Sequence, residues 1–369
     1  MRLMKNDSVG QLIMIGVPGK ELDVETAQLF RRVQPGAFIL FGRNLENAAQ
    51  LRRLIDDLRD VSEIEPIITV DQEGGRVSRL RRIGSEPPNA QQLREKHDVN
   101  LIRCHGDITG RLLRLFGFNL DLCPVLDISF NDEAENSLRG RCYGRTVEEV
   151  IRNASAFNEA MREQGIASCG KHFPGYSAAT SDAHYQLPRI DRSREELDQN
   201  ELAVFRQFAN DVDSMMICHG WYPCFETEKT PASLSRRVTT DLLRGELGFN
   251  GLAMTDDLDM GAILTGYTLE DTIRLAVTAG NDLVMICHRI PEINNVRRIL
   301  GTLPADQIDR ALARVAHFKK NLTPPDEFSE HAFQKIDNEI WDLRIHVLGE
   351  ERAKMRDPQS RPVSPVEMF

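Results

Sequence analysis

The densest group of residues able to carry out acid–base chemistry lies between positions 170 and 188, in Gly170-Lys-His-Phe-Pro-Gly-Tyr-Ser-Ala-Ala-Thr-Ser-Asp-Ala-His-Tyr-Gln-Leu-Pro188. Within this stretch, Asp182 stands two residues before His184. On a loop, a carboxylate at this spacing can bond one imidazole nitrogen and raise the basicity of the other. The pair is a candidate general acid/base, although a surface aspartate beside an incidental histidine explains the spacing equally well.

A second candidate is Asp256, which closes the apolar run 252–256. With an ordinary pKa of about 3.9, a carboxylate here is ionised at neutral pH and can act as a nucleophile or a metal ligand. Asp256 or Asp257 can instead cap the following helix, since aspartate is a preferred N-cap residue. Both roles can hold, because there are two residues and one cap. Asp259 is expected to be simply solvated.

A third stretch, Asp71-Gln-Glu-Gly-Gly-Arg-Val-Ser-Arg79, follows another apolar run. Its two glycines favour a tight turn that brings the backbone close to a ligand. Asp71 accepting sugar hydroxyls, with Arg76 or Arg79 as donors, suits a polyol substrate. A charged turn with an internal salt bridge is the alternative. Arg141, in a separate loop, has no interpretation by its local sequence alone.

Metal and phosphate motifs are missing from the sequence. There is no H-E-x-x-H, no Cys/His cluster at zinc spacing and no glycine-rich phosphate loop. His172, His184 and Asp256 can converge as ligands, but nothing local requires it. We therefore expect neither a metal nor an organic cofactor.

The elements that must position these residues are apolar runs separated by amphipathic segments. Continuous apolar runs are typical of strands buried on both faces, and eight are present, at 11–16, 37–41, 66–71, 120–127, 167–172, 214–219, 252–256 and 282–288. Helical spacing of apolar residues marks segments between them, including 51–58, 147–163, 194–210 and 269–279. The pattern predicts an α/β fold, either a (β/α)₈ TIM-type barrel or a doubly wound open sheet.

The polar ends of these runs favour the barrel. Six of the runs end in ionisable residues, namely Asp71, Asp127, Lys171-His172, His219, Asp256 and His288. In a barrel, the carboxyl ends of all strands converge on one mouth, where active sites form. An open sheet would spread most of these groups along one edge.

The barrel pattern ends at about residue 320. Residues 1–320 are therefore expected to form the catalytic barrel. Residues 321–369 are expected to form a short C-terminal helical extension, with a linker, a helix over 328–348 and a proline-rich tail over 356–366. About 50 residues are too few for a second full α/β domain.

Composition limits the class of partner and the compartment. The 369 residues carry a formal charge of −10, which disfavours nonspecific binding to nucleic acid or an anionic membrane surface. The seven cysteines form no C-x-x-C pair, which is typical of buried free thiols in a reducing compartment. No secretion signal or stretch of roughly 18 apolar residues is present. We expect a soluble, cytoplasmic protein.

Seven of the segments together resemble glycoside hydrolase family 3, specifically its single-domain bacterial β-N-acetylhexosaminidases of the cell-wall recycling type. The resemblance runs from about residue 8 to residue 320. It rests on Ile39-Leu-Phe-Gly-Arg-Asn44, Asp71-Gln-Glu-Gly-Gly-Arg-Val77, Pro124-Val-Leu-Asp127, Lys171-His-Phe-Pro-Gly175, Asp182-Ala-His184 with Leu187-Pro188, Pro231-Ala-Ser-Leu-Ser235 and Leu247-Gly-Phe-Asn-Gly-Leu-Ala-Met-Thr-Asp-Asp257.

The resemblance implies a role for each matching residue. It implies that Asp256 is the nucleophile and that His184, held by Asp182, is the acid/base. The residues implied to grip the terminal N-acetylglucosamine are Asp71, Arg79, Arg141, Lys171 and His172. The implied activity is a retaining exo-β-N-acetylglucosaminidase that acts on muropeptide-type glycosides through a covalent glycosyl–aspartate intermediate. The implied partner is a small carbohydrate, with no cofactor, nucleic acid or membrane.

Several positions depart from the family pattern. Tyr176-Ser177 stands where His-Gly is usual, Ala183 where serine is frequent, and Gly140-Arg-Cys-Tyr where Asp-Arg-x-Phe is commoner. These departures leave open a sugar-binding barrel that lacks turnover. Another β-glycosidase and a β-glycoside phosphorylase are the enzymatic alternatives, the latter because a histidine acid/base does not repel an incoming phosphate as a carboxylate would. A metal-dependent hydrolase on the same fold is the least favoured alternative.

Overall fold

The computed structural model describes residues 8–133, 136–179 and 181–356. Eight parallel strands close a barrel in the order β1-β10-β9-β8-β7-β6-β3-β2. These strands are β1 Ile13–Gly16, β2 Ala37–Leu40, β3 Ile67–Val70, β6 Leu120–Asp121, β7 Ala167–Phe173, β8 Ser214–Ile217, β9 Leu252–Asp257 and β10 Leu283–Ile286. Because β1 pairs with both β2 and β10, the sheet has no edge. The predicted (β/α)₈ barrel is confirmed, and the open sheet is excluded.

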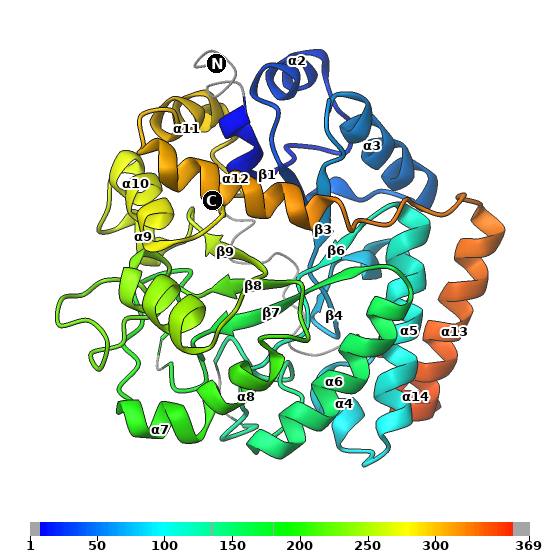
Figure 1. Ribbon diagram of the computed structural model, residues 1–369. Helices are drawn as coiled ribbons and strands as arrows, with labels where there is room; N and C mark the ends of the chain where they lie inside the picture. Colours follow the sequence, from blue (N-terminus) through cyan, green and yellow to red (C-terminus); the bar gives the residue numbers. More distant parts are fainter. Residues whose placement is uncertain (1–7, 134–135, 180, 357–369) are drawn as a thin grey trace.

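The helices form a ring around the barrel (Figure 1). The α-helices are α2 Val24–Val33, α3 Ala48–Asp60, α4 Ala90–Arg94, α5 Val99–Phe116, α6 Val147–Glu163, α7 Arg194–Gln199, α8 Glu201–Phe208, α9 Gly261–Leu264, α10 Leu269–Ala279, α11 Ile293–Leu300, α12 Ala305–Lys319, α13 Glu330–Leu348 and α14 Glu350–Ala353. Shorter helical turns are η1 Val9–Leu12, η2 Gly42–Asn44, η3 Arg79–Arg82, η4 Ala232–Leu234 and η6 Ile290–Glu292, and Arg237–Glu246 (η5) is a π-helix. A two-stranded hairpin, β4 Gln72–Gly74 and β5 Val77–Ser78, follows β3.

Two predicted elements differ most from the sequence pattern. The run 120–127 is a regular strand only at Leu120–Asp121. An isolated bridge from Val125 to Lys171 nevertheless keeps the segment beside β7. The helix expected over 194–210 is broken at Asn200, whose side-chain amide donates to the Glu196 carbonyl at 2.8 Å.

The C-terminal extension packs on the outside of the barrel. Figure 1 shows α13 lying along α5, with the short α14 following it, and Phe333, Ile336, Ile340 and Leu343 of α13 are buried. The helix expected over 328–348 is thus present as α13, whereas residues 357–366 of the expected tail lie outside the described residues.

Two further expectations can be compared with the structure. All seven cysteines are free, and five of them are buried. The expectation of buried thiols is wrong for Cys104 and Cys224, which are exposed. Within the described residues, every helix is too short or too polar to cross a membrane.

Candidate active site

The strands of a closed parallel barrel all point the same way, so the polar groups at their carboxyl ends gather at one mouth. Asp71 directly follows β3, Lys171 and His172 belong to β7, and Asp256 is the penultimate residue of β9. His219 and His288 each lie two residues beyond a strand, β8 and β10. The predicted convergence of these side chains is therefore present in the fold.

A buried network of alternating charges occupies the β3–β7 side of this mouth. Asp71 accepts hydrogen bonds from Arg79 Nη2 at 3.0 Å and from Lys171 Nζ at 2.8 Å. Lys171 Nζ also lies 2.7 Å from Glu73 Oε1, and Arg141 grips both oxygens of Glu73 at 2.7 Å. The internal salt bridge considered as an alternative for the Asp71 turn is thus real, and it is part of a larger cluster.

Charge pairing holds this network in one protonation state. Burial alone raises the pKa of Glu73, but the positive charges of Arg141 and Lys171 outweigh burial and lower it to about 2. Lys171 and Arg79 likewise hold the pKa of Asp71 well below its ordinary value, against the effect of burial. Burial lowers the pKa of Lys171, but Asp71 and Glu73 together raise it far above its usual range. At neutral pH all of these groups are ionised and fixed in place.

Arg141 and Glu73 show what local sequence could not indicate. The local sequence around Arg141 gave it no role, and only the family resemblance did. In the structure it lies in the network, and its Nη2 is 3.3 Å from His172 Nε2. Glu73 was overlooked, because its partner Arg141 lies 68 residues away in the sequence. Arg76, considered as a donor beside Arg79, instead bonds the Ser137 carbonyl.

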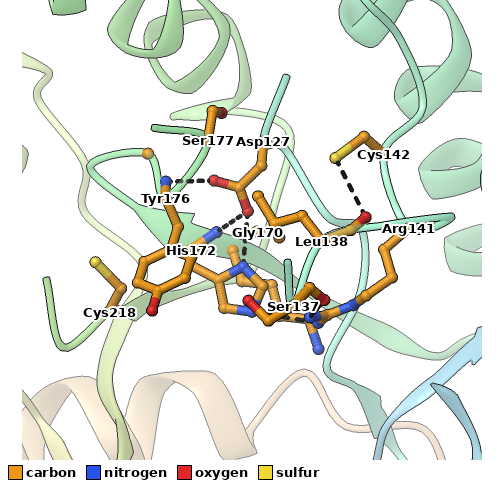
Figure 2. A network of polar contacts seen from close by, with 12 residues as sticks. Asp127, Ser137, Leu138, Arg141, Cys142, Gly170, His172, Tyr176, Ser177 and Cys218 are labelled. Carbon is orange, nitrogen blue, oxygen red and sulfur yellow. Dashed lines mark hydrogen bonds and ion pairs between the residues drawn. The ribbon is translucent and has the colours of Figure 1, made fainter. Parts of the chain in front are cut away.

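His172 is oriented by Asp127, which is fully buried. Figure 2 shows the Asp127 carboxylate bridging the His172 imidazole and the backbone nitrogen of Tyr176. Asp127 Oδ2 accepts from His172 Nδ1 at 2.7 Å and from the His172 backbone N–H at 3.2 Å. Because a guanidinium can only donate, His172 Nε2 accepts from Arg141, and Nδ1 carries the proton shared with Asp127. Asp127 was foreseen only as a strand end.

The Asp182–His184 pair is formed as the spacing suggested. His184 Nδ1 lies 2.5 Å from Asp182 Oδ1, which also accepts the His184 backbone N–H at 3.0 Å. This contact leaves His184 Nε2 as the nitrogen available to a ligand. The two side chains are therefore in direct contact, and the carboxylate fixes the orientation of the imidazole.

The loop that carries this pair lies on the turn after β9. Gly261 N–H donates to the His184 carbonyl and Ala262 N–H to the Ala183 carbonyl, each at 3.0 Å. A methyl group on Gly261 would lie 2.6 Å from the His184 carbonyl oxygen, so only glycine permits this approach. Since Gly261 is five residues beyond Asp256, the two predicted catalytic groups belong to neighbouring segments of the mouth.

Two expectations about the aspartates at and just beyond the end of β9 are wrong. The residue at the N-cap position of α9 is Met260, so neither Asp256 nor Asp257 caps that helix. Asp259 is buried rather than solvated, and it accepts the backbone N–H groups of His288 and Arg289. Asp257 is also buried and accepts the N–H groups of Asp259 and Cys287. These two carboxylates anchor β9 to β10 and leave Asp256 as the half-buried carboxylate of the strand.

His219 and His288 also support β9. His219 Nε2 donates to the Asp257 carbonyl at 2.8 Å, and its Nδ1 contacts the Ser233 hydroxyl. His288 lies between Arg43, at 3.3 Å from its Nδ1, and the Asp257 carboxylate, at 3.6 Å from its Nε2. No group of three or more metal-ligating side chains occurs in the described ranges, so His172, His184 and Asp256 do not form a metal site there.

Comparisons with known proteins agree on one family. The model of the glycosyl hydrolase family 3 N terminal domain matches residues 4–318. A beta-hexosaminidase of Pseudomonas aeruginosa is 34% identical over 323 residues, which cover 85% of this chain and 88% of that protein. A beta-hexosaminidase of Vibrio cholerae is 35% identical over 329 residues, which cover 88% of this chain and 94% of that protein. The solved family 3 beta-N-acetylglucosaminidase of Paenibacillus sp. FPU-7 superposes with a TM-score of 0.82 at 33% identity, over 92% of this chain and 68% of that one.

Proposed function

The chain belongs to glycosyl hydrolase family 3 and is a glycoside hydrolase, and we propose that it is a retaining exo-β-N-acetylglucosaminidase that acts on muropeptide-type glycosides. One observation carries the proposal. The loop holding the Asp182–His184 pair is hydrogen-bonded to the turn that follows Asp256, at the mouth that also holds the buried charge network. A nucleophile candidate, an acid/base candidate and a polar binding surface therefore share one mouth.

The first step of the proposed reaction forms a glycosyl–enzyme. The Asp256 carboxylate attacks the anomeric carbon while His184 Nε2–H gives its proton to the oxygen of the leaving group, and the glycosidic C–O bond breaks. Asp182 accepts from His184 Nδ1, so it stabilises the imidazolium that must be present at the start of this step.

The second step releases the sugar with its original anomeric configuration. Neutral His184 Nε2 takes a proton from water, the water oxygen attacks the anomeric carbon, and the bond to Asp256 breaks. The two displacements at one carbon give overall retention. The negative charge of Asp256 also stabilises the oxocarbenium-like transition state of both steps.

The proposed sugar-binding residues are Asp71, Arg79, Arg141, Lys171 and His172. The charge network fixes their orientation before a substrate arrives, so little ordering is left to occur on binding. Ionised Asp71 can accept sugar hydroxyls, while Arg79 and Lys171 have N–H groups to donate. No metal or organic cofactor enters this mechanism.

Hydrolysis of aryl β-N-acetylglucosaminides by wild type, Asp256→Ala and His184→Ala tests the proposal. We expect Asp256→Ala to lose nearly all activity and His184→Ala to be impaired mainly in hydrolysis of the glycosyl-enzyme, because an aryl leaving group needs little protonation. NMR of the first product should show the β-anomer. An α-anomer first product, or full activity in Asp256→Ala, would contradict the mechanism.

Product analysis separates the proposal from its alternatives. Free N-acetylglucosamine formed without phosphate supports hydrolysis, whereas a sugar phosphate formed only with phosphate indicates a phosphorylase. Binding without turnover of any aryl glycoside would indicate a sugar-binding barrel. Faster cleavage of an N-acetylglucosaminyl-anhydromuramyl peptide than of chitobiose would support the muropeptide class. A cytoplasmic location stays a prediction, which cell fractionation would test.

A further inference from the structure

Tyr176 is a buried residue with contacts on both sides of the site. Its backbone N–H donates to Asp127 Oδ1 at 2.5 Å, and its side chain is only 6% exposed. Its hydroxyl donates to the Ser181 carbonyl at 3.1 Å and accepts the Ala183 backbone N–H at 3.0 Å. The hydroxyl therefore closes the turn that carries Asp182 and His184.

The backbone contact of Tyr176 continues into the charge network. Asp127 divides its carboxylate between two partners, with Oδ1 on Tyr176 and Oδ2 on His172 (Figure 2). His172 in turn contacts Arg141, which grips Glu73. A continuous series of hydrogen bonds thus runs from the proposed sugar-binding residues to the acid/base loop through Tyr176.

The far side of the loop has its own anchor. Gly261 and Ala262 donate their backbone N–H groups to the His184 and Ala183 carbonyls, as described above. The segment 181–184 is therefore held between the Tyr176 hydroxyl and the turn after β9. Ser177 fixes the start of the loop, because its hydroxyl accepts the Ile128 N–H at 2.9 Å.

We propose that Tyr176 is a positioning residue for the acid/base, through a hydroxyl that holds the Asp182–His184 turn in place before the leaving group binds. The inference rests on the proposed function. It adds a role for a residue outside the proposed catalytic and sugar-binding residues. Tyr176 does not touch the reacting atoms in this assignment. It acts through His184 by fixing the backbone on which the imidazole stands.

The substitution Tyr176→Phe tests the role, because it removes the hydroxyl and keeps the ring and the backbone contact with Asp127. We expect kcat/KM on an unactivated disaccharide to fall about tenfold, the effect of one lost buried hydrogen bond, with KM little changed. On a dinitrophenyl N-acetylglucosaminide, whose leaving group needs no proton, kcat/KM should change less than about twofold.

Azide supplies a second readout. In Tyr176→Phe, hydrolysis of the glycosyl-enzyme should be slow, because water needs His184 as its base. Azide needs no base, so its nitrogen attacks the anomeric carbon directly, the bond to Asp256 breaks, and a glycosyl azide forms. We therefore expect azide to raise kcat of the variant on the dinitrophenyl substrate and to leave wild type nearly unchanged.

Tyr222→Phe is the matched control, because it removes another buried hydroxyl, which donates to the Gly175 carbonyl at 2.6 Å and does not contact residues 181–184. It should lower the melting temperature without changing leaving-group dependence or azide response. An equal loss of kcat/KM on both substrates in Tyr176→Phe would overturn the inference. So would a Tyr222→Phe variant that loses kcat/KM on the disaccharide but not on the dinitrophenyl substrate. Wild type that cleaves neither substrate would instead overturn the proposed function.

Discussion

Replacing Glu73 with glutamine removes one negative charge from the buried network while nearly preserving the size of the side chain. Glu73 is 5% exposed and accepts from both Arg141 and Lys171 at 2.7 Å. A glutamine has one acceptor oxygen instead of two and turns an N–H₂ group toward these cations. The variant leaves two buried positive charges with an incomplete partner.

The size of the loss follows from the pKa of the carboxyl. The pKa of Glu73 is lowered from 4.5 to about 2. At about 1.4 kcal/mol per pKa unit, this amounts to roughly 3 kcal/mol of folding stability. Removing one partner of a buried ion pair costs about 3–5 kcal/mol, which agrees. A carboxyl with a lowered folded-state pKa stabilises the fold above pH 4.5 and loses this contribution as the pH falls toward 2. We expect a deficit of about 3 kcal/mol at pH 7 and about 2 kcal/mol at pH 3.5.

Urea unfolding of wild type and Glu73→Gln at pH 7 and pH 3.5 measures both quantities. Glu63→Gln is the control, since its side chain is exposed and lies outside the network, and it should cost less than about 0.5 kcal/mol. A deficit below about 1 kcal/mol at pH 7, or one that does not shrink at pH 3.5, would refute the view that Glu73 is a paired, ionised carboxylate.

Three further substitutions test the buried carboxyl of Glu201 on α8 and two contacts of the site. Burial raises the pKa of Glu201 from 4.5 to about 7, so the fold loses stability as the pH rises through this interval. Between pH 4 and pH 8, thermal melts should therefore show Glu201→Gln gaining up to about 3 kcal/mol of folding stability over wild type. Gly261→Ala places a methyl group against the His184 carbonyl, so kcat/KM on the unactivated disaccharide should fall tenfold or more, beyond any loss on the dinitrophenyl substrate. Asp127→Asn weakens the acceptor for His172 Nδ1–H, so kcat/KM should fall about 10–100-fold and the ¹⁵N shifts of His172 should show a changed tautomer ratio.

The barrel could be predicted because its strands are buried on both faces and therefore leave continuous apolar runs. The helices 147–163 and 269–279 have the predicted bounds, since threonine caps their first turns at Thr146 and Thr268. Asn200 breaks the helix that the apolar spacing predicts over 194–210. Its side chain bonds the Glu196 carbonyl and ends one helix, although the apolar spacing continues beyond it. The spacing of apolar residues does not reveal that a side chain competes with the backbone for this hydrogen bond.

The site was predictable where chemistry is local and unpredictable where it depends on closure of the barrel. Asp182 and His184 are two residues apart, so their contact needs only a turn. Glu73 and Arg141 meet only because β4, in the hairpin after β3, and the loop before α6 reach the same mouth, and neither segment carries a signal for the other. Asp259 was misjudged for a related reason, because its partners are the backbone N–H groups of His288 and Arg289 and the Arg289 guanidinium, all in the loop after β10, some 30 residues away in the sequence.

The departures from the family pattern follow the same logic. Taken singly, Tyr176 and Ala183 look like losses from a loop that must carry a catalytic imidazole. In the structure they contact each other, because the tyrosine hydroxyl accepts the Ala183 backbone N–H, and both residues are buried. The alanine between the dyad residues has no hydroxyl, and the Tyr176 hydroxyl closes the turn by accepting the Ala183 backbone N–H. We therefore expect a single substitution at either Tyr176 or Ala183 to be poorly tolerated. The double substitution should have a non-additive effect on the dependence of kcat/KM on the leaving group.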